Sequence, residues 1–164
     1  MSEQLSTEPD LSVGNAAVGV DVVGISAFAE QLAEPGTRFS RAFTPGEMRA
    51  ARRGHESQAD GSPSRFEAES LAARWAAKEA VIKAWLSTRF GGPEVIEPDH
   101  VDLREIEVRT DAWGRPAIRL HGAVARAMTG YDVLVSLSHD PAADIAVAFV
   151  VLQVAPRPPG APED

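Results

Sequence analysis

Residues 64–86, SRFEAESLAARWAAKEAVIKAWL, are the stretch that decides the fold of this chain. Ser64 and Glu67 have the spacing of a capping box, in which two side chains hydrogen-bond the free backbone amides at the start of a helix. The residues that follow are mostly alanine, leucine and other strong helix formers. The stretch therefore predicts the longest helix of the protein, running from Ser64 to about Leu86.

This helix contains both lysines of the 164-residue chain, Lys78 and Lys83, whereas every other basic residue is an arginine. Arginine can replace lysine on a solvated surface, but not where a compact ammonium must meet a phosphate or a carboxylate in a tight space. The two lysines lie on either side of Glu79 and indicate a functional site around it. Residue usage alone could give the same pattern.

Strands and helices alternate on both sides of this helix. The apolar, β-branched run from Ala16 to Val23 predicts a core strand, and Thr44, Pro45 and Glu47 have the pattern of a helix start. The other expected elements are a helix over 25–33, strands over 101–109 and 117–120, a helix over 121–130, and buried strands over 133–138 and 145–151. Because strict βαβ repetition is missing, we expect an α+β fold. A mixed or antiparallel sheet would pack with one long central helix and shorter helices.

Length and composition indicate a single domain. A chain of 164 residues is large enough to bury one core. We expect a flexible N-terminal segment over residues 1–15, a domain over 16–153, and a disordered proline-rich tail over 154–164. The N-terminus has no targeting pattern and no apolar run has membrane-spanning length, so we expect a cytoplasmic protein without a membrane partner.

Composition also limits the chemistry. The chain has no cysteine, which excludes disulfides, thiolate zinc sites and cysteine nucleophiles. Any metal would be held by oxygen or imidazole ligands, which favours a hard cation such as Mg²⁺. The net charge of −8 argues against general binding of nucleic acid. Since glycine-rich phosphate loops and a Gly-x-Ser-x-Gly elbow are missing, a nucleotide would need another kind of pocket.

Two carboxylates stand in apolar surroundings. Asp21 interrupts the run Val18–Val23, where an ionised carboxylate is costly unless it has a partner or a metal. Glu79 precedes Lys83 by four residues on a helix that is otherwise mostly apolar. A hydrogen-bonded structural aspartate and a helix ion pair are the alternatives. Together, Asp21 and Glu79 could bind a Mg²⁺ that keeps several waters and contacts substrate phosphates.

His139 lies where a predicted strand passes into a loop, a position at which functional groups are often displayed. A structural histidine with its hydrogen bonds satisfied is the alternative.

Four short motifs come in an order and spacing that resemble a known family. They are Gly19-Val-Asp21, Arg74-Trp-Ala-Ala-Lys-Glu-Ala-Val-Ile-Lys-Ala84, Gly114-Arg-Pro116 and Ser136-Leu-Ser-His139. From about Val18 to Leu152, the chain closely resembles the holo-[acyl-carrier-protein] synthases, the small bacterial type of 4′-phosphopantetheinyl transferase.

The resemblance implies transfer of phosphopantetheine from coenzyme A to a serine of apo acyl carrier protein, or of a carrier domain, in fatty acid biosynthesis. The by-product would be adenosine 3′,5′-bisphosphate. The resemblance also implies a homotrimer with each site at a subunit interface. Asp21 and Glu79 match the family's magnesium ligands, and with Lys83 they are the expected catalytic residues. The expected coenzyme A contacts are Arg74, Lys78, Lys83, Gly114, Arg115, Pro116, Ser138 and His139.

Three points stay open. The base that activates the carrier serine could be Glu79 or a metal-bound water. The helix over 25–34 lacks the basic residues that relatives often use to dock the acidic carrier, so the arginines between Arg38 and Arg53 are the expected docking patch. Competing functions are a non-catalytic nucleotide- or carrier-binding module and a magnesium-dependent phosphohydrolase.

Overall fold

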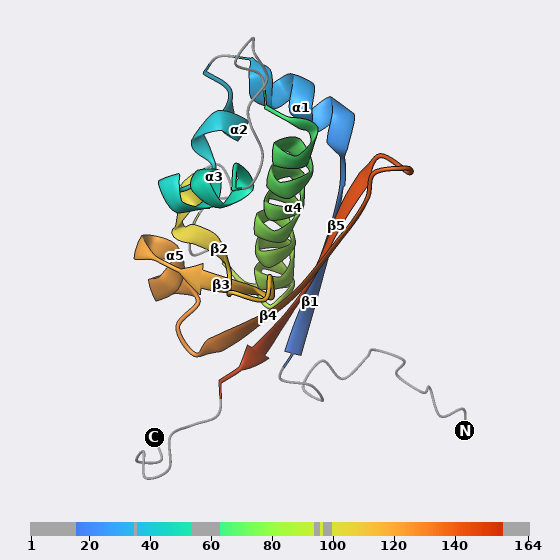
Figure 1. The fold of residues 1–164 in the computed structure, drawn as a ribbon. Helices are drawn as coiled ribbons and strands as arrows, with labels where there is room; N and C mark the ends of the chain where they lie inside the picture. Colours follow the sequence, from blue (N-terminus) through green and yellow to red (C-terminus); the bar gives the residue numbers. More distant parts are fainter. Residues whose placement is uncertain (1–15, 35, 54–62, 94–95, 97–99, 156–164) are drawn as a thin grey trace, which may run out of the picture.

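The fold is built around one long helix that lies against a small sheet (Figure 1). The computed structural model describes residues 16–34, 36–53, 63–93, 96 and 100–155. Helix α4 (Arg65–Ser87) packs on the sheet formed by β1 (Ala16–Gly24), β5 (Ile145–Val154) and β4 (Tyr131–Asp140), in the order β1-β5-β4 with antiparallel neighbours. A second antiparallel pair, β2 (Ile106–Thr110) and β3 (Pro116–Leu120), connects α4 to β4.

The shorter helices cover the remaining sides of α4. Helices α1 (Ile25–Ala33), α2 (Arg38–Arg41) and α3 (Pro45–Ala51) gather beside its first half (Figure 1). A 3₁₀ turn, η2 (Leu103–Glu105), precedes β2, and α5 (Gly122–Ala127) follows β3. Two apolar clusters form the core, and α4 contributes to both of them, with its alanines allowing close packing on every side.

The α+β fold expected from the sequence is confirmed, as is the long helix. At Thr44 the capping box forms in full, because the Glu47 amide donates to Thr44 Oγ1 at 3.2 Å and the Thr44 amide donates to the Glu47 carboxylate at 2.8 Å. At the start of α4 only half of the box forms. The Glu67 amide donates to Ser64 Oγ at 3.2 Å, but the Glu67 carboxylate binds Arg52 instead.

Two expectations about strands are wrong. Residues 101–105 are not part of a strand, because Asp102 accepts a hydrogen bond from the Arg104 amide and starts η2 there. The strands β1, β4 and β5 are not buried on both faces, because α4 covers one face only. Apolar side chains on the other face, which we call the outer sheet face, stay exposed: Val18, Val20, Val22, Leu134 and Phe149.

The ends of the chain were expected to be mobile. Residues 1–15 and 156–164 lie outside the described residues, and β5 continues to Val154, one residue into the expected tail. Among the helices of the described part, none is both long and apolar enough to cross a membrane.

Candidate active site

Close contact between β1 and α4 brings the predicted site residues together. A Cβ built on Gly19 would lie 2.0 Å from the carbonyl oxygen of Ala80 and 2.7 Å from the amide nitrogen of Ala84. Only a residue without a side chain lets the backbone of α4 approach β1 so closely. Since alternate residues of a strand share a face, Asp21 points toward the same helix.

Asp21 and Lys83 form an ion pair, with 2.7 Å between Oδ1 and Nζ. The same ammonium donates to the carbonyl oxygen of Val20 at 3.2 Å. Glu79 lies one turn earlier on α4 and is partly buried. Burial raises the pKa of Glu79, and the charge of Asp21 raises it further, whereas Arg38 and Lys83 act in the opposite direction. The fold therefore groups two carboxylates and an ammonium, and one of the carboxylates is biased toward its protonated form.

These three side chains line a hollow of about 330 Å³, which we call the carboxylate pocket. Aromatic rings form part of its wall, with 4.4 Å between the ring centroids of Phe39 and Trp75. The Arg38 guanidinium lies 5.2 Å from the Phe39 centroid and 5.3 Å from that of Trp75. Such cation–π contacts hold a guanidinium in place while leaving its hydrogen-bond donors available.

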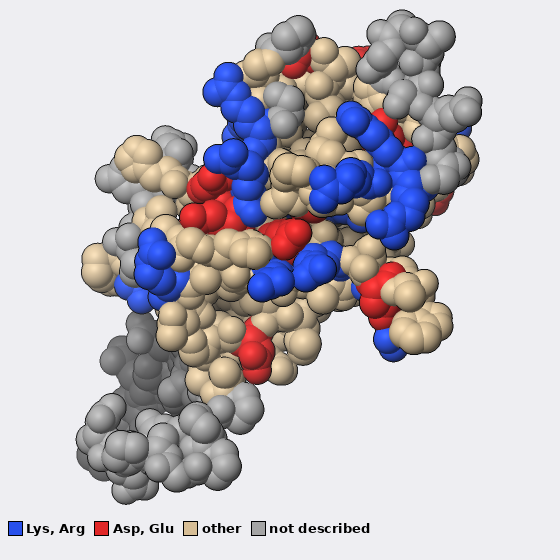
Figure 2. All heavy atoms as spheres, turned by 60° about the vertical axis from the view of Figure 1, so that its left-hand side comes forward, with Lys and Arg blue, Asp and Glu red and all other residues tan. Residues whose placement is uncertain are grey.

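A second hollow of about 500 Å³ adjoins the carboxylate pocket, because Arg38 and Glu79 line both. We call it the side groove. Its other lining residues are Arg41, Ala42, Ile82, Val101, Asp102 and Leu103. Figure 2, in which the side of α2 and α3 comes forward, shows Lys and Arg side chains gathered around a smaller number of acidic ones. The site thus combines a charged pocket with a groove that is partly apolar.

The ligand set of the carboxylate pocket fits a hard divalent cation. Among the described residues, no group of three or more His, Asp or Glu side chains is arranged to hold a metal ion. Two carboxylates suffice for Mg²⁺, which usually keeps several waters and takes further ligands from substrate phosphates. In the free protein the Lys83 ammonium neutralises Asp21, so a metal ion would share this carboxylate with it. Asp21 and Glu79 could hold the ion.

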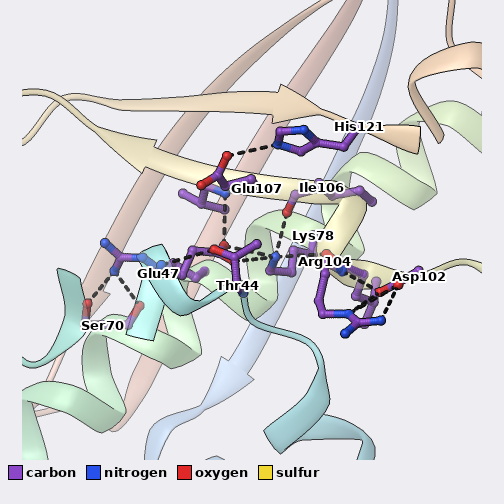
Figure 3. Close-up of polar contacts among 12 residues, drawn as sticks. Thr44, Glu47, Ser70, Lys78, Asp102, Arg104, Ile106, Glu107 and His121 are labelled. Atoms are coloured by element: carbon purple, nitrogen blue, oxygen red, sulfur yellow. Dashed lines mark hydrogen bonds and ion pairs between the residues drawn. The ribbon is translucent and has the colours of Figure 1, made fainter. Parts of the chain in front are cut away.

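The structure places Lys78 and Arg74 elsewhere, contrary to their expected contact with coenzyme A. Lys78 is fully buried and pairs with Glu47, with 2.9 Å between Nζ and Oε1 (Figure 3). Arg74 is also buried and donates to the carbonyl oxygen of Ser70 at 3.0 Å and to its hydroxyl. Lys78 reaches α3 and β2, and neither Lys78 nor Arg74 lines the carboxylate pocket, so we remove both from the expected ligand-binding set.

The remaining expected contacts lie away from the pocket of their own chain. Gly114, Arg115 and Pro116 form the β2–β3 turn, in which Gly114 has a φ of 79° and Arg115 pairs with Asp111. Ser138 and His139 are exposed near the end of β4. None of these five residues is among the described residues that line the carboxylate pocket or the side groove.

Comparison with known proteins gives the same family as the motifs. The model of the 4′-phosphopantetheinyl transferase superfamily matches residues 17–150. This chain belongs to that superfamily. The holo-[acyl-carrier-protein] synthase of Mycolicibacterium paratuberculosis is 48% identical over 142 residues, which cover 86% of this chain and 98% of the relative. The protein of that name from Mycobacterium leprae is 46% identical over 142 residues, 87% of this chain and 99% of the relative.

Solved structures of this transferase family have the same fold. The Chronobacterium ammoniagenes complex of the synthase with coenzyme A superimposes with a TM-score of 0.72 at 42% identity, covering 86% of this chain and 98% of that chain. The acyl carrier protein synthase of Mycobacterium tuberculosis gives a TM-score of 0.62 at 42% identity, with 84% and 96% covered. The family and the enzyme class expected from the four motifs are therefore confirmed.

Sequence reasoning missed several residues in and around the carboxylate pocket. Arg38 was expected only as part of a docking patch, and no local pattern connected it with Trp75. Asp144 was not considered at all, although its carboxylate accepts from the Ser26 amide at 3.0 Å and from the Ser26 hydroxyl at 2.7 Å. It thereby caps α1, which lines the pocket, from a turn 118 residues away. The unusual feature of Asp144 is its backbone φ of 56°, which is rare for a residue other than glycine. This angle is known only from the structure, so nothing in the sequence indicated it.

Proposed function

We propose that this chain transfers 4′-phosphopantetheine from coenzyme A to a serine of an apo acyl carrier protein or carrier domain, leaving adenosine 3′,5′-bisphosphate. The single observation that carries the proposal is the cluster of Asp21, Glu79 and Lys83 in one open pocket. Two of the four family motifs supply this cluster. The high identity to holo-[acyl-carrier-protein] synthases over 86% of the chain supports the choice of substrates.

Charge explains how the pocket would hold coenzyme A. The pyrophosphate is a dense anion, and the pocket offers it the Lys83 ammonium and the Arg38 guanidinium. When bound to Asp21 and Glu79, Mg²⁺ would supply additional neutralisation of phosphate charge. Phosphoryl transfer depends mostly on such positioning and charge balance, since little covalent help from the protein is required.

Glu79 is suited to remove the proton from the carrier serine. Burial and the charge of Asp21 raise its pKa, which makes it a stronger base than an exposed glutamate. The serine oxygen attacks the β-phosphorus, and the bond from this phosphorus to the bridging oxygen of the pyrophosphate breaks. The electron pair leaves with adenosine 3′,5′-bisphosphate, whose new negative charge Lys83 would balance.

The outer sheet face supports the trimer that the family resemblance implied. Val18, Val20, Val22, Leu134 and Phe149 are each at least 43% exposed on neighbouring strands, and several exposed apolar side chains on one face favour contact with another protein. In a homotrimer, Gly114–Pro116, Ser138 and His139 of one subunit would complete the pocket of another. This arrangement accounts for their distance from the pocket of their own chain.

The expected docking patch for the carrier divides into two parts. Arg38 and Arg41 line the site itself, whereas Arg49 is exposed on α3. Arg52 is bound to Glu67. We keep Arg41 and Arg49 as the proposed contacts for an acidic carrier, because electrostatic attraction between the two would speed association. The proposed setting is fatty acid biosynthesis in the cytoplasm.

Mass spectrometry of the carrier tests the proposed reaction. The full chain is incubated with coenzyme A, Mg²⁺ and apo carrier protein, and the carrier should gain one phosphopantetheine. Asp21→Ala and Glu79→Ala should remove nearly all transfer while leaving the chain folded, and Glu34→Ala, an exposed carboxylate outside the pocket, serves as the control. Phosphate release without carrier modification would indicate a phosphohydrolase instead, and neither reaction would indicate a binding module.

A further inference from the structure

Lys78 and Glu47 form a buried ion pair at the centre of a larger network (Figure 3). Their side chains are 0% and 1% exposed. The ammonium also donates to the carbonyl oxygens of Leu103, at 2.9 Å, and Ile106, at 2.6 Å. Its three hydrogens are therefore fully used inside the protein, and the residue is not available to a ligand.

The Glu47 carboxylate is equally occupied. It accepts from the Thr44 amide at 2.8 Å and from the Val108 amide at 2.9 Å, in addition to the Lys78 ammonium. The pair therefore joins three parts of the chain that are far apart in sequence: the α2–α3 connection, the centre of α4, and the segment from η2 into β2.

Two of these parts are the walls of the side groove. Ala42 and Leu103 line the groove from opposite segments. Lys78 holds Leu103 through its carbonyl oxygen, and its ammonium lies 5.5 Å from the centroid of the Phe43 ring, next to Ala42. The floor between the walls is formed by Glu79 and Ile82 of α4. One buried ammonium thus contacts both of the segments that line the groove.

Stability alone does not explain such a pair. A buried ion pair can often be replaced by apolar residues at no cost in stability, because removing two charges from water is expensive. Burial indeed lowers the pKa of Lys78, in opposition to Glu47. What an apolar pair would not provide is directed hydrogen bonding to two backbone carbonyls and two backbone amides, which fixes the walls in one arrangement.

The groove suits the part of coenzyme A that lies beyond the pyrophosphate. It adjoins the carboxylate pocket through Arg38 and Glu79, and its lining includes the apolar side chains of Ala42, Ile82, Val101 and Leu103. The pantetheine arm is an uncharged chain of methylene and amide groups that starts at the reacting phosphate. A partly apolar groove next to the proposed phosphate pocket matches this chemistry.

We infer that Lys78 is a positioning residue: with Glu47, it holds the walls of the side groove at the separation that accepts the pantetheine arm of coenzyme A. This inference rests on the proposed function, since it requires coenzyme A to bind in the carboxylate pocket.

Two ligands distinguish the contribution of the pantetheine arm to binding from that of the nucleotide. Coenzyme A carries the pantetheine arm, and adenosine 3′-phosphate 5′-diphosphate has the same nucleotide and pyrophosphate without it. Binding of each to the full-length chain is measured by titration calorimetry for the wild type and for Lys78→Met, which keeps the length of the side chain but removes its hydrogen bonds. Coenzyme A should bind about tenfold more weakly to the variant, equivalent to roughly 1.4 kcal/mol, whereas the affinity for adenosine 3′-phosphate 5′-diphosphate should not change.

A second variant and a control keep the test decisive. Loss of one partner of a buried pair costs stability, so Glu47→Asp, which keeps both charges and shortens the carboxylate arm, should show the same selective loss in a milder form. Met128→Ala also removes buried contacts, but Met128 directly follows α5 and does not line the groove. It should leave both affinities unchanged.

Several results would overturn the inference. An equal loss of both affinities would mean that the pair supports the whole site, and no loss in a folded variant would mean that the walls do not depend on it. If neither Lys78→Met nor Glu47→Asp folds, the pair is a requirement of the fold and not a positioning device. Failure of the wild type to bind either ligand would instead refute the proposed function, and the inference with it.

Discussion

Lys83 neutralises Asp21 in the free protein and would compete there with a divalent cation. The ammonium lies 2.7 Å from the carboxylate, and two positive groups close to one carboxylate repel each other. Coenzyme A would relieve this competition by giving the ammonium a phosphate as a new partner. Binding of metal and binding of nucleotide would therefore favour each other through this one side chain.

We predict that Lys83→Met binds a divalent cation more tightly than the wild type when no nucleotide is present. Removal of the competing charge should strengthen binding by about fivefold, a moderate effect because the lysine is partly exposed to screening solvent. Titration with Mn²⁺, followed by electron paramagnetic resonance, measures the affinity. Arg65→Met removes a comparable charge that pairs with Glu69 instead and should have no effect. Unchanged or weaker binding by Lys83→Met would show that the two cations do not compete.

Glu79 gives a prediction on pH. Burial raises the pKa of Glu79 above the ordinary value of 4.5, with a further contribution from Asp21. The folded protein therefore binds this proton more tightly than the unfolded chain does. Its contribution to stability is present below the unfolded pKa and is lost as the pH rises through the folded pKa.

Glu79→Gln should accordingly increase the free energy of unfolding at neutral pH, and the difference from the wild type should shrink as the pH falls through the raised pKa of the folded protein and disappear below the ordinary value of 4.5. Urea denaturation at several pH values measures this. The comparison is made without divalent cations, because a bound cation would stabilise the ionised carboxylate. A variant that is less stable than the wild type at neutral pH would contradict the assigned direction.

At the scale of elements, the packing of α4 on β1 depends on Gly19. A side chain here would meet the backbone of Ala80 and Ala84, and backbone atoms cannot rotate away as a side chain could. The helix would have to shift, and Glu79 and Lys83 would move away from Asp21 with it. Stability and activity are therefore linked at this position.

We predict that Gly19→Ala lowers the stability of the fold by about 1–3 kcal/mol and removes most transfer activity. Gly24→Ala is a matched control for stability at the end of the same strand, where the nearest atom lies 3.9 Å from the added Cβ and the φ of −71° suits any residue. Its activity is not compared, because Gly24 lines the carboxylate pocket. Chemical denaturation and the carrier mass assay measure the two effects. Equal stability of the two variants would show that close packing at Gly19 is unnecessary.

At the scale of the whole molecule, the outer sheet face should hold three copies of the chain together. Phe149 lies in its middle, opposite Val20 on β1 and Ser136 on β4. A charge at this position would be costly to bury in an interface but harmless in a free monomer. The fold of each chain should therefore survive its introduction.

We predict that the wild type sediments as a trimer and that Phe149→Glu sediments as a folded monomer. The monomer should also lose affinity for coenzyme A, because Gly114–Pro116 of a neighbouring subunit would no longer reach the pocket. Phe90→Glu makes the same replacement at an 88% exposed position that is not on the outer sheet face, and it should stay trimeric. Analytical ultracentrifugation distinguishes the outcomes, and a trimeric Phe149→Glu would place the interface elsewhere.

The sequence by itself determined the features that depend on neighbours along the chain. The helix start at Thr44 was predictable, because both partners of its capping box lie within four residues. The long helix was predictable from composition, and the four motifs identified the family. Local signals were weaker at 101–105, where alternating apolar and charged residues resembled a strand but a single aspartate cap produced a 3₁₀ turn.

Only the tertiary structure decided which side of α4 carries the site. The helix is surrounded by the sheet, α1, α3 and β2, so its apolar residues point in all directions and no polar stripe marks an outer face. Lys78 and Lys83 therefore looked alike in the sequence. Five residues apart on a helix, they point in different directions, and one entered the core beside Glu47 while the other reached Asp21. The same reason explains why the sequence did not predict the roles of Arg38 and Asp144 or the walls of the side groove. Their partners meet only after the chain has folded.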